Sequence, residues 1–208
     1  RHTRYWRDWS SDVCSSDLPE VIRSHFPEGY VGHGIDIGAS DGISINSTYL
    51  LEKNHHWNII SVEPNIDFAK SLRYHRAFVE FCACSFKPGR LQMHINDDNP
   101  EAYSSLNPTK RKDLFGIDKA QWRTVEVKVE TVDRILRKWE FPKLDFICVD
   151  TEGTEKDVLE GAMLDVWKPK VIVSESWDDD GGEVRKYLED KGYERIMRSY
   201  HNDVYRRS

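Results

Sequence analysis

The sequence lacks any apolar run long enough to cross a membrane. Its longest uncharged apolar runs, such as residues 146–149 and 171–173, are far shorter than the roughly 18 residues that a membrane span requires. It also lacks an excess of positive charge, since 30 Lys and Arg stand against 36 Asp and Glu and give a net charge of −6. Such a chain has no long-range attraction for phosphate backbones. We therefore expect neither a membrane-bound protein nor a nucleic-acid partner.

The N-terminal segment shows none of the patterns of a folded domain. The chain begins at Arg1 rather than at a methionine, so we interpret it as a fragment, and it lacks the apolar stretch and cleavage site of a signal peptide. Residues 8–18 match the translation of a sequencing adapter, so we interpret residues 1–18 as an artefactual or disordered segment. A natural Ser/Asp-rich arm is the alternative. Residues 19–208 are then the size of a single domain.

Cysteine is scarce: beyond Cys14 in that segment, the chain holds only Cys82, Cys84 and Cys148. An odd number is not typical of a disulfide framework, and one Cys-x-Cys pair without a second Cys/His pair is a weak zinc signal. We expect reduced thiols buried in strands of a cytoplasmic protein.

Short apolar runs alternate with helix-like segments from Tyr30 onward. Continuous apolar strands between helices are typical of a parallel sheet covered on both faces, because such strands have no polar face. The predicted fold class is therefore α/β, doubly wound. We predict strands at 34–37, 59–62, 79–83, 146–149 and 171–174, and helices at 44–53, 66–75, 131–139, 155–164 and 182–191.

Two regions depart from this alternation. Residues 91–129 hold a short strand at 91–95, a polar loop through residue 112 and an alternating strand at 124–129, which together predict an insertion over one sheet edge. Residues 194–197 and 203–205, joined around His201 and Asn202, predict a closing antiparallel hairpin.

The turn after the first predicted strand contains glycines and acids in a spacing that suits a cationic ligand. Gly38 and Gly42 permit a tight turn and close backbone approach, and the following helix directs free N–H groups at the ligand. Asp36 precedes the first glycine and Asp41 lies in the loop; these carboxylates would repel a pyrophosphate but attract a sulfonium with an ammonium group. The turn therefore favours S-adenosylmethionine over NAD. The alternative is an ordinary turn in which Asp41 caps the helix.

The second predicted strand ends at Glu63, followed by Pro64 and Asn65. An acid at this strand tip, about 20 residues beyond the glycine turn, is placed to accept hydrogen bonds from ribose hydroxyls. This feature indicates an adenosine-containing ligand, although it does not separate NAD from S-adenosylmethionine.

With these residues the chain resembles the FkbM family of S-adenosylmethionine-dependent methyltransferases over about residues 34–205. The resemblance is carried by blocks at residues 35–39, 62–65, 104–106, 127–133 and 145–155, of which the last is the most specific. It implies a Rossmann-like class I methyltransferase fold, a mostly parallel seven-stranded sheet whose last strand is antiparallel. It also implies methyl transfer to a hydroxyl of a small molecule, such as a sugar or secondary metabolite, or of a glycan.

The resemblance and the two turns together give a set of candidate cofactor-binding residues. They are Asp36, Gly38, Ala39, Ser40, Asp41, Gly42, Glu63, Pro64, Asn65, Ser85 and Asp150. After the third strand the family usually has Ser-Asp, whereas this chain has Ser85 followed by Phe86, so an acid that could contact the adenine amine is missing.

Methyl transfer to an alcohol benefits from a base that takes the hydroxyl proton. Asp150 follows the fourth predicted strand of the large sheet and is the first candidate, with Glu152 beside it and Glu175 after the next strand. Each has the alternative of a solvated loop charge. Glu155 is interpreted as a first-turn helix acid.

The remaining polar residues give weaker indications of function. Residues 178–182 lack the spacing of a calcium loop, so no metal is predicted. His94 is interpreted as a surface imidazole and Ser104 with Ser105 as part of an acceptor pocket.

Two rival functions remain. A Tyr-x-x-x-Lys pattern at Tyr187 and Lys191, with Ser174 upstream, is typical of short-chain dehydrogenases, but the glycine turn is not, and we expect Tyr187 to pack on a helix face. The other rival is a non-catalytic adenosine-ligand-binding module of the same fold.

Overall fold

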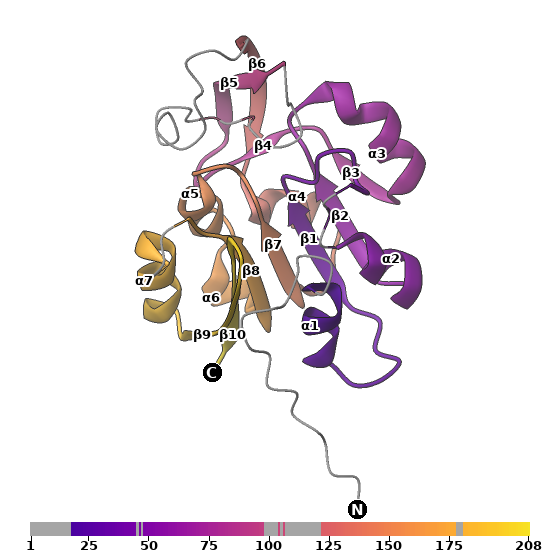
Figure 1. Ribbon diagram of the computed structural model, residues 1–208, viewed down its shortest axis with the longest axis vertical. Coiled ribbons are helices and arrows are strands. Elements are labelled where there is room, and N and C mark those ends of the chain that lie inside the picture. The colour runs from indigo at the N-terminus through magenta and orange to yellow at the C-terminus, as the bar shows by residue number, and fades with distance from the viewer. Residues whose placement is uncertain are drawn as a thin grey trace, which may run out of the picture.

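The computed structural model describes residues 18–44, 46, 48–97, 104, 106, 122–177 and 181–208. Their strands form two sheets (Figure 1), a seven-stranded sheet in the order β3-β2-β1-β7-β8-β10-β9 and a three-stranded sheet in the order β4-β6-β5. The strands are β1 (His33–Ile37), β2 (Asn58–Val62), β3 (Phe78–Glu80), β4 (Ala83–Cys84), β5 (Gly89–Asn96), β6 (Trp122–Glu130), β7 (Phe146–Val149), β8 (Val171–Glu175), β9 (Tyr193–Ser199) and β10 (Asn202–Arg207).

The large sheet is mostly parallel, which confirms the predicted fold class. Strands β3, β2, β1, β7 and β8 pair in parallel, whereas β10 pairs antiparallel with both β8 and β9. The last strand in sequence therefore lies inside the sheet, between β8 and β9. This is the antiparallel closing hairpin that the sequence predicts.

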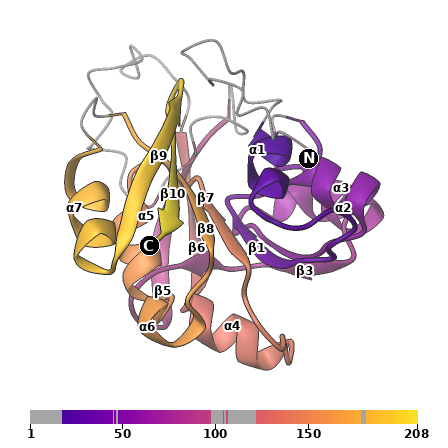
Figure 2. The same ribbon diagram turned by 90° about the horizontal axis from the view of Figure 1, so that it is seen from below.

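Helices cover both faces of the large sheet (Figure 2). One apolar cluster joins the sheet to α4, α5, α6 and α7, and a second joins its other face to α1 and α2, beside which α3 lies in both views. The helices are α1 (Leu18–Ser24), α2 (Tyr49–His55), the 3-10 helix η2 (Ile66–Phe68), α3 (Ala69–His75), α4 (Val132–Lys138), α5 (Glu155–Glu160), α6 (Leu164–Trp167) and α7 (Gly182–Asp190).

Both clusters use alternate residues of the same strands. Ile147 and Val149 of β7 belong to the first cluster, whereas Phe146 and Cys148 belong to the second. Burial of both faces explains why the sequence of β7 is continuously apolar. Within the described part of the chain, every helix falls short of the length and apolar character needed to cross a bilayer.

Several predicted elements have different bounds in the structure. The predicted strand 79–83 is two strands: β3 pairs with β2 in the large sheet, and β4 pairs with β6 in the small one. The predicted helix 155–164 is divided into α5 and α6 by Met163, whose φ of 51° interrupts a right-handed helix. These divisions depend on tertiary contacts such as strand pairing, which the local periodicity of the sequence does not predict.

The start of α2 is also later than predicted, at residue 49 rather than 44. The Asn46 side-chain oxygen accepts hydrogen bonds from the backbone N–H groups of Thr48 (3.0 Å) and Tyr49 (2.9 Å). This turn satisfies the first amides of α2 from outside the helix. Residues before it therefore belong to the loop that follows β1.

At the N-terminal boundary, Leu18 differs from the expectation that residues 1–18 lie outside the domain. Its side chain is fully buried in the second apolar cluster as the first residue of α1. The described domain thus includes Leu18.

The three cysteines Cys82, Cys84 and Cys148 are free and buried. Cys84 and Cys148 lie in strands β4 and β7, whereas Cys82 lies in the connection between β3 and β4. Burial raises the pKa of the Cys148 thiol well above its usual range.

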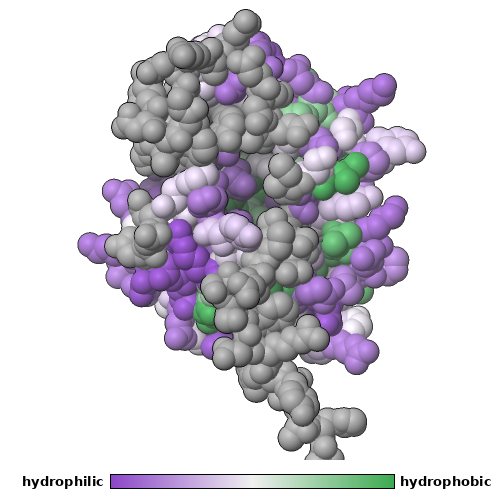
Figure 3. Space-filling view, in the orientation of Figure 1, coloured by the Kyte–Doolittle hydropathy of each residue, from purple (hydrophilic) through white to green (hydrophobic). Residues whose placement is uncertain are grey.

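The described residues on the face shown in Figure 3 are predominantly hydrophilic. On this face the hydrophobic side chains over α2 and α3 form separate spots among hydrophilic ones. Single apolar side chains of this kind are usual on protein surfaces.

Candidate functional site

The loop after β1 makes a close approach to the end of β7. The Asp150 backbone N–H donates to the carbonyl of Ile37 (2.9 Å), at the last residue of β1. Gly38 follows with φ of 87°, and a Cβ atom on it would lie 1.7 Å from the carbonyl oxygen of Asp150. A side chain at position 38 would therefore separate the two strand ends.

The same loop is joined to the end of β2. The backbone N–H groups of Gly38 (2.9 Å) and Ala39 (3.1 Å) donate to the carbonyl of Val62, and the N–H of Gly42 closes the turn on Ala39 (2.9 Å). The predicted glycine turn thus lies between β2 and β7, at the carboxyl ends of the parallel strands, where open α/β sheets bind ligands.

Glu63 links this loop to the one after β2. Its side chain is only 5% exposed; one oxygen accepts from the Ser40 backbone N–H (2.9 Å) and the other from that of Asn65 (2.8 Å). Burial raises the pKa of Glu63 to about 7, while these two hydrogen bonds oppose the shift and the charges of Asp36 and Asp150 reinforce it.

Asn65 completes this corner of the site. Its side-chain oxygen accepts from the Asp67 backbone N–H (3.1 Å) and begins the short helix η2. Its side-chain amide nitrogen is buried and has no hydrogen-bond partner among the described residues. An unpartnered buried donor is unfavourable in the free protein and is a place where a ligand acceptor would bind favourably.

The two aspartates of the glycine turn have protein partners. Asp36 is only 3% exposed, and one of its oxygens accepts from Thr48 Oγ1 (2.7 Å) and Asn46 Nδ2 (2.9 Å). Asp41 accepts through one oxygen from the backbone N–H groups of Ile43 (2.9 Å) and Ser44 (2.7 Å), a local turn. Both aspartates shape the loop through these oxygens.

The three acids predicted as catalytic lie together at the ends of β7 and β8. Asp150 is exposed, Glu152 is half-buried and Glu175 is buried, and one carboxylate oxygen from each lies within 4.8 Å of those of the other two. Such a cluster provides acceptors for a proton or a cation. Asp150 and Glu175, which are separated in the chain by α5, α6 and most of β8, thus meet at one point.

Backbone conformation brings Glu152 into this cluster. Its φ is 59°, a left-handed conformation that is unusual for a residue with a side chain, and Gly153 follows with φ of 105°. Glu155 holds the turn, since one oxygen accepts from the backbone N–H groups of Gly153 (2.8 Å) and Thr151 (3.1 Å) and from Thr151 Oγ1 (3.2 Å). Its position in the first turn of α5 matches the prediction, but its contacts with the turn were missed.

The described contacts of Ser85 are with residues outside the glycine turn and the acid cluster. Its backbone N–H donates to the Glu130 carbonyl (3.1 Å), and its own carbonyl lies against Gly161 at the end of α5. These contacts join the small sheet to the α4–α5 side of the molecule. Pro64 is half-buried between Glu63 and Asn65.

The other polar residues that the sequence analysis named lie in different parts of the chain. His94 Nδ1 lies 3.3 Å from Thr124 Oγ1 on the small sheet. Ser104 is half-buried, whereas Ser105 and residues 178–180 lie outside the described residues.

The dehydrogenase pattern is dispersed in the structure. Tyr187 packs on the first apolar cluster and its hydroxyl lies 3.4 Å from the Leu159 carbonyl, as predicted for a helix-packing residue. Lys191 pairs instead with Asp165, and Ser174 is buried within β8. The described contacts of these residues therefore do not form a hydride-transfer site.

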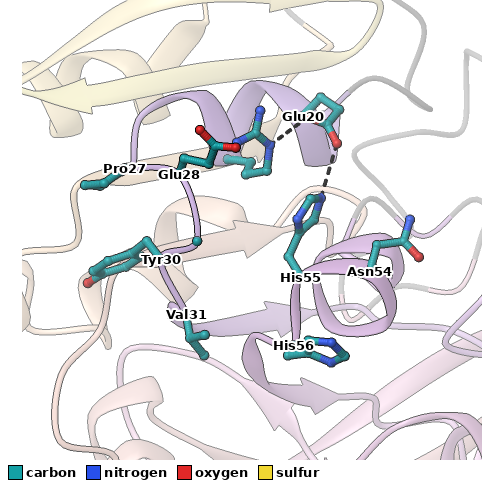
Figure 4. A pocket seen from close by; sticks show the side chains of 10 residues that line it. Glu20, Pro27, Glu28, Tyr30, Val31, Asn54, His55 and His56 are labelled. Atoms are coloured by element: carbon teal, nitrogen blue, oxygen red, sulfur yellow. Dashed lines mark hydrogen bonds and ion pairs between the residues drawn. The ribbon is translucent and has the colours of Figure 1, made fainter.

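A cavity of about 680 Å³ lies at the other ends of β1 and β2 (Figure 4). It is lined by residues that precede these strands, including Tyr30, Val31 and His55, and Glu20 bridges Arg23 and His55 at its rim. Because it opens at the amino ends of the strands, it is separate from the strand-tip acids and glycines.

Comparison with known proteins agrees with this arrangement. The sequence pattern of the family described as "Methyltransferase FkbM domain" matches residues 36–195. Methyltransferase sdnD of Sordaria araneosa is 25% identical, over 77% of this chain and 73% of that protein.

A solved structure described as methyltransferase FkbM from Methylobacillus flagellatus KT matches with a TM-score of 0.60 and 16% identity. The match covers 94% of this chain but only 48% of the other, so the chain spans about half the length of that protein. At this identity the match supports the fold. The sequence family match includes the glycine turn, Glu63 and the three clustered acids.

Proposed function

The chain belongs to the FkbM methyltransferase family, and we propose that it transfers a methyl group from S-adenosylmethionine to a hydroxyl oxygen of a sugar, glycan or secondary metabolite. The observation that supports this proposal best is the convergence of a glycine turn, a buried ribose-type acid and three clustered carboxylates at one end of the sheet.

The residues at the ends of β1 and β2 fit the proposed cofactor. The lack of a side chain at Gly38 lets the loop after β1 lie directly against the end of β7, where the ligand is proposed to bind. Each Glu63 oxygen uses one lone pair on a loop amide and retains acceptor capacity for a ribose hydroxyl. The buried, unpartnered amide nitrogen of Asn65 supplies a donor for a base or ribose acceptor. When bound, S-adenosylmethionine supplies an electrophilic methyl group.

The whole predicted set enters this proposal in two roles. Gly38, Ala39, Ser40, Glu63, Pro64, Asn65 and Asp150 border the ligand position, and Asp36, Asp41 and Gly42 shape the loop beside it. Ser85, which follows β4, is retained in the proposal on the strength of the family resemblance alone.

The clustered acids are proposed to handle the acceptor proton. An alcohol is a poor nucleophile until its proton is transferred, and a positioned carboxylate contributes about 10²–10⁴-fold to such a step. Asp150 is the proposed base, because it is exposed and its backbone contacts the glycine turn. Glu152 and Glu175 each place a carboxylate oxygen within 4.8 Å of one of Asp150, so they are the proposed neighbours of this base.

Titration calorimetry with S-adenosylmethionine, S-adenosylhomocysteine and NAD tests the cofactor part. Binding of the first two and not of NAD is expected. Binding of NAD alone would overturn the proposal in favour of an oxidoreductase.

Asp150→Ala tests the catalytic part, with Glu28→Ala as an exposed acid before β1 for control. In an acceptor screen with radiolabelled cofactor, Asp150→Ala is expected to lose methyl transfer at least a hundredfold while retaining cofactor affinity. Unchanged turnover would refute the assignment of Asp150. Cofactor binding by the unmodified protein without transfer to any hydroxyl acceptor would favour the non-catalytic module.

A further inference from the structure

Arg76 is a charged side chain buried beneath the loop that follows β1. It comes directly after α3, and its side chain is 0% exposed. One terminal nitrogen donates to the Gly42 carbonyl (3.2 Å) and to Asn46 Oδ1 (3.0 Å), and the other donates to Thr48 Oγ1 (2.8 Å). All three acceptors belong to the glycine loop or its junction with α2.

Two carboxylates balance the charge of Arg76. Asp36 Oδ2 lies 3.7 Å from one terminal nitrogen, and Glu52 Oε2 of α2 lies 2.9 Å from Nε. A buried guanidinium requires such partners, and its planar fork of donors can serve several acceptors at once. Arg76 therefore joins β1, the glycine loop, α2 and α3 in one network.

Asn46 extends the network toward the ligand side of the loop. Its amide nitrogen donates to Asp36 Oδ2 (2.9 Å) and to the Ala39 carbonyl (3.2 Å), while its oxygen accepts from Arg76. Gly42 packs on the Arg76 stem, because a Cβ there would lie 3.0 Å from Arg76 Cγ. Contacts of Arg76, direct or through Asn46, thus reach the described loop residues Ala39, Gly42 and Thr48.

We propose that Arg76 is a positioning residue for cofactor binding, which acts through Asp36, Asn46 and Gly42 by holding the glycine loop in its ligand-binding shape. This inference rests on the proposed function, from which the identity of the ligand is taken. It also assigns Asp36 a role as the buried counterion of Arg76.

The network provides its own control. Three hydrogen bonds and one ion pair of Arg76 hold the loop and β1, whereas the ion pair with Glu52 holds α2. Arg76→Lys keeps the charge but cannot reach all the loop acceptors. Glu52→Gln removes a charge from the same guanidinium and leaves the loop contacts in place.

The experiment measures the dissociation constant of S-adenosylhomocysteine by calorimetry, thermal denaturation, and hydrogen exchange of peptides covering residues 38–48. Arg76→Lys is expected to raise the dissociation constant about tenfold or more and to speed exchange in the loop. Glu52→Gln is expected to change the dissociation constant less than twofold even where it lowers the melting temperature.

Thr48→Val is the second variant, for the case in which Arg76→Lys does not fold. It removes the hydroxyl that joins Arg76 to Asp36 while keeping the side-chain volume, and it is expected to raise the dissociation constant about fivefold.

The inference would be overturned if Glu52→Gln raised the dissociation constant as much as Arg76→Lys or Thr48→Val does. It would also be overturned if hydrogen exchange in residues 38–48 were unchanged in Arg76→Lys or, where that variant does not fold, in Thr48→Val. If the unmodified protein binds neither S-adenosylmethionine nor S-adenosylhomocysteine, the proposed function fails. Loop exchange then still decides whether Arg76 holds the loop.

Discussion

The loops after β1 and β2 differ from the turn after β7 in how they are held. The first pair is fixed by buried side chains from distant parts of the sequence, since Ser40 bonds to Glu63 and Gly42 to Arg76. The turn after β7 is closed by contacts of Glu155 with residues two and four positions away. The described contacts of the first region reach across the chain, whereas those of Glu155 in the second are local and only the Asp150 end of β7 bonds to β1.

This difference matches the tasks proposed for the two regions. The proposed cofactor site benefits from a shape that is fixed before binding, because preorganisation lowers the free-energy cost of association. Carboxylates at the acceptor side need access to a substrate, and Asp150 is accordingly exposed while Asp36 and Glu63 are buried. Changes in the first region should therefore alter affinity for the cofactor, and changes in the second should alter turnover.

The largest effect is expected for Gly38→Ala, because this glycine is where the two regions meet. A Cβ atom would lie 1.7 Å from the Asp150 carbonyl oxygen, at a φ that favours glycine. Strain and overpacking together should lower the free energy of unfolding by on the order of 4 kcal/mol and abolish cofactor binding. Urea denaturation and calorimetry measure both.

Gly89→Ala is the matched control, since no atom lies within 4 Å of a Cβ built there. It should change the free energy of unfolding by less than about 1 kcal/mol. Similar behaviour of the two variants would mean that the approach of Gly38 to β7 does not matter.

Glu63→Gln is expected to remove a pH dependence of stability from the first region. The pKa of Glu63 is raised from an ordinary value of 4.5 to about 7, so between these values the folded protein holds a proton that the unfolded chain has lost. Stability from this group is therefore complete below about pH 4.5 and falls as pH rises to about 7. The difference in unfolding free energy between the unmodified protein and the variant should fall by about 3 kcal/mol over that range.

Glu20→Gln gives a control of opposite sign. The pKa of Glu20 is lowered, chiefly by its hydrogen bond to Arg23, so any stabilisation by this exposed carboxylate grows as pH rises. Denaturation curves at several pH values compare the two. A flat difference for Glu63→Gln would show that this carboxyl is not desolvated in solution.

The smallest of the three effects is expected for Glu155→Gln, in the second region. Loss of the charge weakens three hydrogen bonds that hold the turn carrying Glu152, so turnover should fall about tenfold while cofactor affinity changes less than twofold. Asp157→Asn, in the same helix turn, is the control for the helix dipole. A larger effect on affinity than on turnover would contradict the division of tasks.

Local pattern was sufficient to predict most of the large sheet. The apolar run of β7 was predicted with the bounds that the structure has, and β8 differs by one residue. A strand that is buried on both faces, such as β7, is recognised from its composition, because it carries apolar residues at consecutive positions. The position of Glu63 after β2 likewise followed from the spacing of the glycine turn.

Contacts between distant residues explain what was missed. Arg76 and Asn46 are ordinary polar residues in sequence, and their importance arises only when α3 and the glycine loop are brought together. The clustering of Asp150, Glu152 and Glu175 was anticipated because strand ends share an edge of the sheet. The contacts of Asp36 within the protein were not, because a charge pattern does not show which partner an oxygen faces. Asp41 accepts from backbone N–H groups as in the capping alternative, but in a local turn ahead of α2.

The position of β10 has a consequence for biosynthesis. β9 leaves the ribosome before β10, yet β10 lies between β8 and β9 and pairs with both. β9 thus cannot join the sheet through β8 during translation and must wait for the final strand. The edge of β8 therefore stays unpaired until β10 has been synthesised, and an unpaired strand edge is a site at which chains aggregate.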